Sequence, residues 1–406
     1  MISGEMMLAI NGFGTVSCLG SSLAETIESL RSKGCAPGWA HDLSFPGISP
    51  DSLWEADISR FDASGEDYFR LLGAERIKTE SRSIVLLRHA MAELAPELDA
   101  AFTRFGKDRT ACVIGTSTAS LNEAERSLYD GKTPAEGFDF SMADVACMSD
   151  YVRDTLKIGG PCWSAATACT SSARALISAA GLIESGMADA VIAGGVSSVS
   201  HVTAAGFRSL GVLSPKRCLP FHRERQGINI GEAAVLSVIT REPLLESGLF
   251  LAGFGATADG FSISAPAPDA GPQKDAVREA VRRAGIGLSD ISCAALHGTG
   301  TIANDQMESR LMHDLLPEVP AFAPKYFTGH TLSAAGAMGV MLSALVIEDE
   351  IPIPALPYAD GDVDPELPEF CLVTQPGLRC SGKYALSGSY AFGGNNASII
   401  IGTHKK

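Results

Sequence analysis

The sequence has little positive charge and no closely spaced set of metal ligands. Its 406 residues include 32 Lys and Arg against 47 Asp and Glu, a formal net charge of -15. A nucleic-acid-binding protein needs an electropositive face, so this balance argues against that class and requires any acidic partner to bind a local basic patch. The ten cysteines include no CxxC pair and no close Cys/His cluster. We therefore expect no metal site.

Long hydrophobic segments are also missing. No stretch approaches the roughly twenty uninterrupted apolar residues that span a bilayer. The N-terminal segment MISGEMMLAINGFGTVS lacks a basic region followed by a long apolar run. We expect no membrane span, no signal peptide, and a cytoplasmic protein with reduced thiols. Because 46% of the residues are apolar and 19% are charged, the chain can bury one large core or two fused ones.

Short apolar runs punctuated by 42 glycines alternate with segments of helical spacing. The apolar runs read as buried strands, and strands interleaved with helices predict an α/β layered fold. Strands are predicted at 111–117, 188–195, 293–300 and 396–403. Helices are predicted at 81–94, 170–186 and 273–285.

Two parts of the chain resemble each other weakly. Residues 115–118 (GTST) match residues 298–301 (GTGT), each after a small apolar strand, and Glu125 and Glu308 follow at equal offsets. Glycine and threonine are common in strand-to-helix turns, so chance can also give this match. If the sequence is duplicated, the halves meet near residues 245–255.

Cys169 lies in SAATACTSSARAL, where a small-residue strand runs into a helix that is expected to begin at about Thr170. A thiol at a helix N-terminus is close to unpaired backbone N–H groups, which favour the thiolate. The alternative is a buried structural cysteine. The small flanking residues favour a reactive thiol, because they leave room for a substrate to reach the sulfur.

Two histidines and a glycine pair occupy similar junctions. His297 directly follows an apolar strand, and His330 opens another small-residue helix five residues after Lys325. Each alone could be an ordinary loop residue, but one cysteine and two histidines at such junctions together indicate a catalytic site. The glycine pair after Phe392 forms either an ordinary tight turn or one that aims a backbone N–H into a cleft.

These segments resemble, in order, the β-ketoacyl-acyl-carrier-protein synthases of the Cys-His-His branch. This branch includes the elongating ketosynthases of bacterial fatty acid and type II polyketide synthesis. The resemblance extends nearly end to end, and five motifs in family order are very specific. The motifs are TACTSSARAL (167–176), GFRSLGVLSP (206–215), HGTGTIANDQMES (297–309), KYFTGHTLSAAGA (325–337) and SYAFGGNNAS (389–398).

The resemblance implies the α/β thiolase fold, with two similar βαβαβαββ halves stacked as five layers, αβαβα. It places the nucleophile in a half formed by residues 1–250 and the two catalytic histidines in a half formed by residues 251–406. It also implies a dimer. The partner would be a second copy of the chain or a homologous subunit that resembles a chain-length factor.

The resemblance also assigns catalytic roles. Cys169 matches the nucleophile that carries an acyl group, and His297 and His330 match the pair that binds the malonyl thioester carbonyl. Lys325 and Glu308 match residues that position these histidines. The implied reaction is a decarboxylative Claisen condensation of the acyl group with malonyl-acyl-carrier protein, giving β-ketoacyl-acyl-carrier protein.

Further matching positions concern substrate binding. The backbone N–H groups of Cys169 and Phe392 match the oxyanion hole, with the Phe392 ring as a gate to the acyl pocket. Thr299, Thr301 and Ser264 match contacts to the phosphopantetheine arm. No cofactor is expected, because this arm arrives on the acyl carrier protein.

The chain departs from the family pattern at four positions. His222 and Gln226 replace acidic residues, Gly388 replaces a common Asn, and Ser333 stands where Gly is usual. These departures favour a specialised pathway, such as that of aryl polyene pigments, over housekeeping fatty acid synthesis. A non-elongating subunit of the chain-length-factor type is the alternative, but such a subunit would lack the cysteine.

Carrier binding requires a basic patch on this acidic chain. The densest basic stretch before the nucleophile, residues 74–90, supplies Arg76, Lys78 and Arg82, and a helix in this region helps bind the carrier in the resembling family. The alternative is a solvated helix face, with Lys216 and Arg217 as the next candidate pair.

Overall fold

The computed structural model describes residues 7–32, 53–54, 81–121, 125 and 143–405. Two of the predicted docking residues, Arg76 and Lys78, lie outside this part of the chain. The described strands form a ten-stranded sheet, plus a two-stranded one between β2 (Leu53–Trp54) and β6 (Ile230–Gly231).

The large sheet consists of two halves with the same topology. From its outer edge, the first half runs β4, β3, β5, β7, β1, and the second runs β10, β9, β11, β12, β8. In each half the first three strands pair in parallel, and each of the last two strands pairs antiparallel with the strand before it. The strands of the first half are β1 (Leu8–Ser17), β3 (Thr110–Gly115), β4 (Cys162–Ala165), β5 (Ala190–Ser197) and β7 (Ala233–Thr240). Those of the second are β8 (Leu249–Ala258), β9 (Ile291–Ala295), β10 (Ala321–Phe322), β11 (Tyr384–Tyr390) and β12 (Asn395–Thr403).

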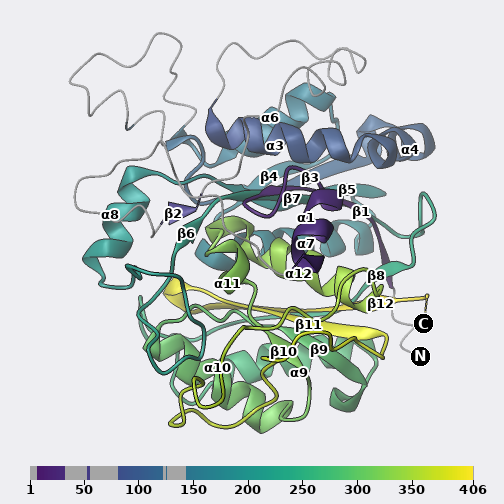
Figure 1. Cartoon of the computed structure of the whole chain (residues 1–406). Coiled ribbons are helices and arrows are strands. Elements are labelled where there is room, and N and C mark those ends of the chain that lie inside the picture. The colour runs from purple at the N-terminus through teal and green to yellow at the C-terminus, as the bar shows by residue number, and fades with distance from the viewer. Residues whose placement is uncertain (1–6, 33–52, 55–80, 122–124, 126–142, 406) are drawn as a thin grey trace.

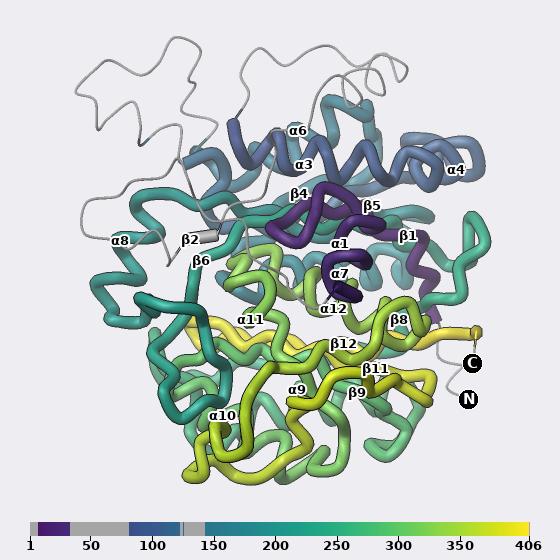
Figure 2. The backbone as a smooth tube through the Cα atoms, viewed as in Figure 1, coloured from purple at the N-terminus to yellow at the C-terminus, as the bar shows by residue number. Residues whose placement is uncertain are grey.

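The two halves are joined where β1 pairs antiparallel with β8, at Leu8 with Leu251 and Ala9 with Phe250. The colours in Figure 2 show that the strands before β8 form one side of the molecule and the strands from β8 onward the other. The duplicated architecture predicted from the sequence is therefore confirmed, and its second set of strands begins at Leu249.

Helices complete five layers (Figure 1). One outer layer contains α3 (Arg82–Glu93), α4 (Ala95–Phe105) and α6 (Ala146–Leu156), and the other contains α9 (Gly271–Ala284) and α10 (Ile302–Leu315). Between the two halves of the sheet lie α7 (Ser171–Glu184) and α12 (Ala335–Ile347). Every residue of α12 from Gly336 to Ile347 is buried, because this helix is covered on all sides.

Close packing of the central helices depends on small residues. A Cβ at Gly115, the last residue of β3, would lie 2.4 Å from the backbone nitrogen of Ser172 at the start of α7. Glycine therefore lets the strand and the helix that follows Cys169 approach each other. The remaining described α-helices are α1 (Leu23–Arg31), α8 (His201–Ser209) and α11 (Lys325–Thr328). Among the residues described, no helix has the length and apolar character required to cross a membrane.

Candidate active site

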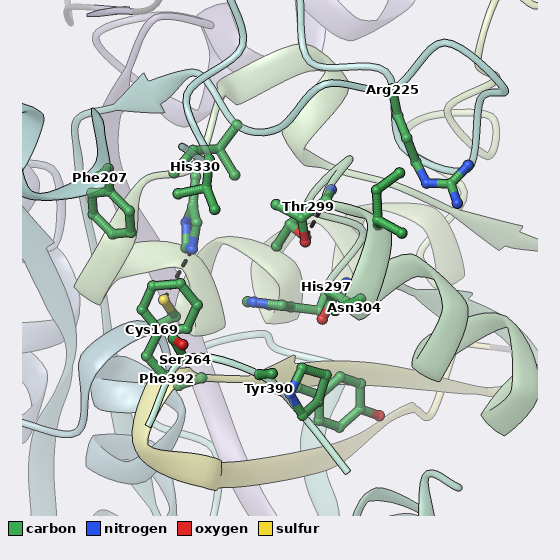
Figure 3. Close-up of a pocket in the computed structure, with 18 of the residues that line it drawn as sticks. Cys169, Phe207, Arg225, Ser264, His297, Thr299, Asn304, His330, Tyr390 and Phe392 are labelled. Carbon is green, nitrogen blue, oxygen red and sulfur yellow. Dashed lines mark hydrogen bonds between the residues drawn. The ribbon is translucent and has the colours of Figure 1, made fainter. Parts of the chain in front are cut away.

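Three turns bring Cys169, His297 and His330 together in a buried pocket (Figure 3). Cys169 lies in the 3-10 turn between β4 and α7, His297 follows β9, and His330 follows α11. The Cys169 Sγ lies 3.0 Å from Nε2 of His330, and one donor atom of each of the three residues lies within 4.8 Å of the others. This donor set could also bind a metal ion, a role that the sequence does not predict.

Tight turns present two of these side chains. Ala168, immediately before Cys169, has φ 53°, and Leu332, two residues after His330, has φ 47°. Non-glycine residues rarely adopt this left-handed region. The helix expected to begin near Thr170 is preceded by a 3-10 turn at Ala168–Thr170, so α7 itself starts at Ser171.

Hydrogen bonds fix the tautomers of both histidines. The backbone N–H of Leu332 donates to Nδ1 of His330 over 3.1 Å, so the neutral ring carries its proton on Nε2, which faces Cys169. The Lys325 ammonium contacts Nδ1 of His297 at 3.1 Å and also donates to the His297 carbonyl. Nδ1 of His297 is therefore an acceptor, and its Nε2–H is left to donate into the pocket.

Both imidazoles are neutral donors. Burial lowers the pKa of His297 and His330 well below the usual value, and the charge of Lys325 lowers both further. The site therefore offers two N–H groups that stay protonated without carrying charge.

Glu308 holds the backbone beside His297. Its carboxylate accepts hydrogen bonds from the backbone N–H groups of His297 and Gly298, each at 2.6 Å. Burial raises the Glu308 pKa to about 7. Glu308 thus contacts the backbone of the His297 segment and Lys325 contacts its ring. The family resemblance assigned to these two residues the positioning of the histidines.

Burial dominates the ionisation of Cys169. It raises the thiol pKa to about 11, although the charge of Lys325 and the backbone N–H groups of Cys169 and Phe392 lower it. Burial outweighs the preference for the thiolate that is expected at a helix N-terminus. The free energy needed to remove the thiolate from water exceeds the stabilisation that these donors provide. The two N–H groups act on the sulfur from the positions predicted for an oxyanion hole.

The pocket has a volume of about 290 Å³. Its lining includes the predicted substrate contacts Ser264, Thr299 and Thr301, and the hydroxyls of the two threonines lie 2.8 Å apart. The Phe392 ring lies 5.9 Å from the ring of Phe207 on α8, centroid to centroid, so two aromatic side chains flank the pocket beside Cys169 (Figure 3).

Family models match most of the chain. The N-terminal domain model of beta-ketoacyl synthase matches residues 7–243, and the C-terminal domain model matches residues 250–359. The chain belongs to the β-ketoacyl synthase family. It is therefore an acyl-transferring enzyme of the ketosynthase type.

Similar proteins include a 3-oxoacyl-acyl-carrier-protein synthase and a nodulation protein. The 3-oxoacyl-acyl-carrier-protein synthase 2 of Rhizobium meliloti is 34% identical over 60% of this chain and 61% of its own length. Nodulation protein E of the same organism is 26% identical over 98% of this chain and 99% of its own length. Among solved structures, a chain from the complex of the ketosynthase ApeO with its chain length factor ApeC, from Xenorhabdus doucetiae, is 33% identical, with 99% of each chain covered and a TM-score of 0.85.

The sequence did not single out Arg225, which lines this pocket, or Asp305, which holds the loop beside it. Asp305 accepts hydrogen bonds from the backbone N–H groups of Phe221 (2.7 Å) and Gly300 (3.2 Å), and it joins the 221–226 segment to the threonine loop. Arg225 pairs with Asp364 at 2.5 Å and lines the pocket. The available signal was the spacing of Asp305 three residues before Glu308, which puts both carboxylates on one side of α10.

Arg82 differs from the exposed docking cation that the sequence predicted. Its guanidinium donates to both carboxylate oxygens of Glu232, with Nε at 2.8 and 2.9 Å. The Arg82 side chain is 18% exposed and that of Glu232 is fully buried. The guanidinium is therefore engaged inside the fold, because it neutralises a buried carboxylate.

Proposed function

We propose that this ketosynthase condenses an acyl group held on Cys169 with a malonyl unit on an acyl carrier protein, releasing carbon dioxide. The observation that carries the proposal is the pair of neutral imidazole N–H groups directed into the pocket that holds the buried thiol. This arrangement suits a reaction in which negative charge develops on an oxygen beside a thioester.

The first step transfers the acyl group. The Cys169 sulfur attacks the carbonyl of the incoming acyl thioester, and the N–H groups of Cys169 and Phe392 stabilise the oxyanion that forms. The bond from the carbonyl carbon to the carrier sulfur then breaks. The carrier leaves as a thiol and takes up the equivalent of the Cys169 proton, so one thioester is exchanged for another.

The second step breaks the bond between the malonyl methylene and its carboxylate. Carbon dioxide leaves, and the electron pair forms an enolate whose oxygen accepts hydrogen bonds from Nε2 of His297 and His330. The enolate carbon attacks the Cys169 thioester and makes the new carbon–carbon bond, which expels the Cys169 thiolate. Neutral donors suit this step because they need not give up a proton.

The pocket also supports the substrate class. Hydroxyls of Ser264, Thr299 and Thr301 line it on the approach to Cys169, where a phosphopantetheine arm offers amide groups to bond. We therefore infer that the acyl and malonyl units arrive on carrier proteins, and that no separate cofactor takes part.

Pathway and partner form the finer part of the proposal. The departures at His222, Gln226 and Gly388 favour a specialised polyketide or polyene pathway, such as aryl polyene synthesis. The likeness to a chain from a complex of a ketosynthase with its chain length factor supports a heterodimer of that kind over a homodimer. Because Cys169 and both histidines are assembled, the chain fits the condensing subunit better than a non-elongating one.

Half-reactions of single-residue variants test the proposed roles. We expect His297→Ala and His330→Ala to lose malonyl decarboxylation by on the order of a hundredfold to a thousandfold, as for loss of one oxyanion donor. Cys169 acylation should fall much less, and more in His330→Ala, since its Nε2 contacts Sγ. The exposed His313 on α10 gives a matched control, His313→Ala, that should keep both activities. Equal loss of both half-reactions in both site variants would contradict the assignment.

A further inference from the structure

Tyr390 forms part of the pocket wall next to His297. It is the last residue of β11, it lines the pocket, and it is 6% exposed. The centroids of the Tyr390 and His297 rings lie 6.1 Å apart, with 71° between the ring planes. The centroids of the His330 and His297 rings lie 5.4 Å apart, with 88° between the planes. In Figure 3, His330 and Tyr390 lie above and below His297. Two edge contacts thus hold the His297 ring.

The Tyr390 phenol folds back along its own strand over Gly388. Residues 388 and 390 lie on the same face of β11, since side chains alternate along a strand. A Cβ at Gly388 would lie 2.8 Å from the Tyr390 hydroxyl oxygen, 3.1 Å from Cζ and 3.2 Å from Cε2. A Cβ at this position would therefore collide with the phenol. Gly388 is also where the resembling enzymes commonly carry Asn.

The hydrogen bonds of His297 leave one degree of freedom to packing. Lys325 contacts Nδ1 of the ring, and Glu308 accepts a hydrogen bond from the backbone N–H. Neither contact prevents the ring from tilting about the Lys325–Nδ1 hydrogen bond, which would move Nε2. Burial and the charge of Glu308 raise the Tyr390 pKa well above its usual range. The phenol therefore stays neutral and contributes a flat, uncharged surface beside the ring.

We propose that Tyr390 is a positioning residue for the His297 imidazole and that Gly388 provides the space its phenol requires. The proposal rests on the proposed function, in which Nε2 of His297 donates to the enolate oxygen. It makes residues 388 and 390 a matched pair: a side chain at 388 displaces the phenol and lets His297 tilt.

The test is a double-mutant cycle on the full chain, read by malonyl decarboxylation and by Cys169 acylation. Gly388→Ala should lower decarboxylation by on the order of a hundredfold, the scale of a misplaced catalytic group, with acylation retained. Tyr390→Leu should show the same split, and Tyr390→Phe should lose far less than Tyr390→Leu. In Gly388→Ala/Tyr390→Phe the 2.8 Å contact is gone, so part of the lost decarboxylation returns and the effects are not additive.

Gly181→Ala on α7 is the matched control, because nothing lies within 4 Å of a Cβ there, and it should behave as wild type. Normal decarboxylation in Gly388→Ala, additive effects in the double variant, or equal loss of acylation in Gly388→Ala would overturn the proposal. His297→Ala measured in parallel separates the two ideas. Full decarboxylation in that variant would refute the proposed function, while thermal unfolding of the four cycle members still reports whether residues 388 and 390 compete for space.

Discussion

At the scale of single residues, the Cys169 thiol has a pKa of about 11, raised by burial, against about 8.5 for an ordinary cysteine. The thiolate fraction at neutral pH is therefore small and grows about tenfold with each pH unit. We expect alkylation of Cys169 to accelerate across pH 6 to 10 without levelling off near pH 9. Rates measured by peptide mapping check this, with Cys169→Ala as the background. A plateau below pH 9 would show that the N–H donors and Lys325 outweigh burial.

The sequence grouped three residues that the structure brings together, Cys169, His297 and His330, but it did not predict all of their surroundings. Cys169 and His297 each follow a strand, as the sequence suggested, whereas His330 lies between α11 and α12 and not directly after a strand. The motifs around all three residues, taken in order along the chain, were sufficient to group them. The close approach of the Tyr390 phenol to Gly388 depends on the direction in which this side chain points along β11. That direction cannot be predicted from the local sequence. The raised pKa of Cys169 likewise depends on burial by distant segments.

At the scale of elements, the Arg82 to Glu232 ion pair ties the N-terminus of α3 to the segment between β6 and β7. We expect Arg82→Ala to destabilise the protein by about 3–5 kcal/mol, the cost of removing one partner from a buried pair. Arg31→Ala is the control: Arg31 pairs with Glu350 where both side chains are half-exposed, and its loss should cost less than about 1 kcal/mol. Denaturant unfolding measures both. Equal stability of the two variants would contradict a structural role for Arg82.

Element positions were more predictable than element contacts. The helices predicted at 81–94, 170–186 and 273–285 correspond to α3, α7 and α9, because helical spacing and capping are local. The partner of Arg82 lies 150 residues away along the chain. From the sequence alone, a basic residue at the start of a helix was therefore interpreted as a docking side chain. Its pairing with Glu232 is visible only in the folded structure.

At the scale of the whole molecule, the net charge of -15 bears on the proposed carrier protein. If that carrier is acidic, the chain has to bind it through a local basic surface. Lys216 is exposed and follows the segment whose Phe207, Gly211 and Val212 line the pocket. We expect Lys216→Glu to raise the KM for acyl carrier without changing alkylation of Cys169. Arg76→Glu and Lys78→Glu, outside the described residues, carry the same prediction.

Salt and a remote charge reversal separate docking from general repulsion. The wild-type KM should rise with ionic strength, because exposed pairs are screened over about 10 Å at 0.1 M. Lys157→Glu, at the exposed end of α6 in an outer helix layer, makes the same charge change away from the pocket and should leave the KM unchanged. If neither salt nor Lys216→Glu changes the KM, the carrier binds elsewhere.

The most direct test of the central claim is the intact mass of the full-length protein after incubation with an acyl-pantetheine thioester. The wild type should gain the mass of one acyl group, and peptide mapping should place it on Cys169. Cys169→Ala should gain none, and Cys169→Gln should gain none while keeping or raising malonyl decarboxylation, since its amide mimics the acylated state. Acylation that persists in Cys169→Ala would show that another residue is the nucleophile and would contradict the account.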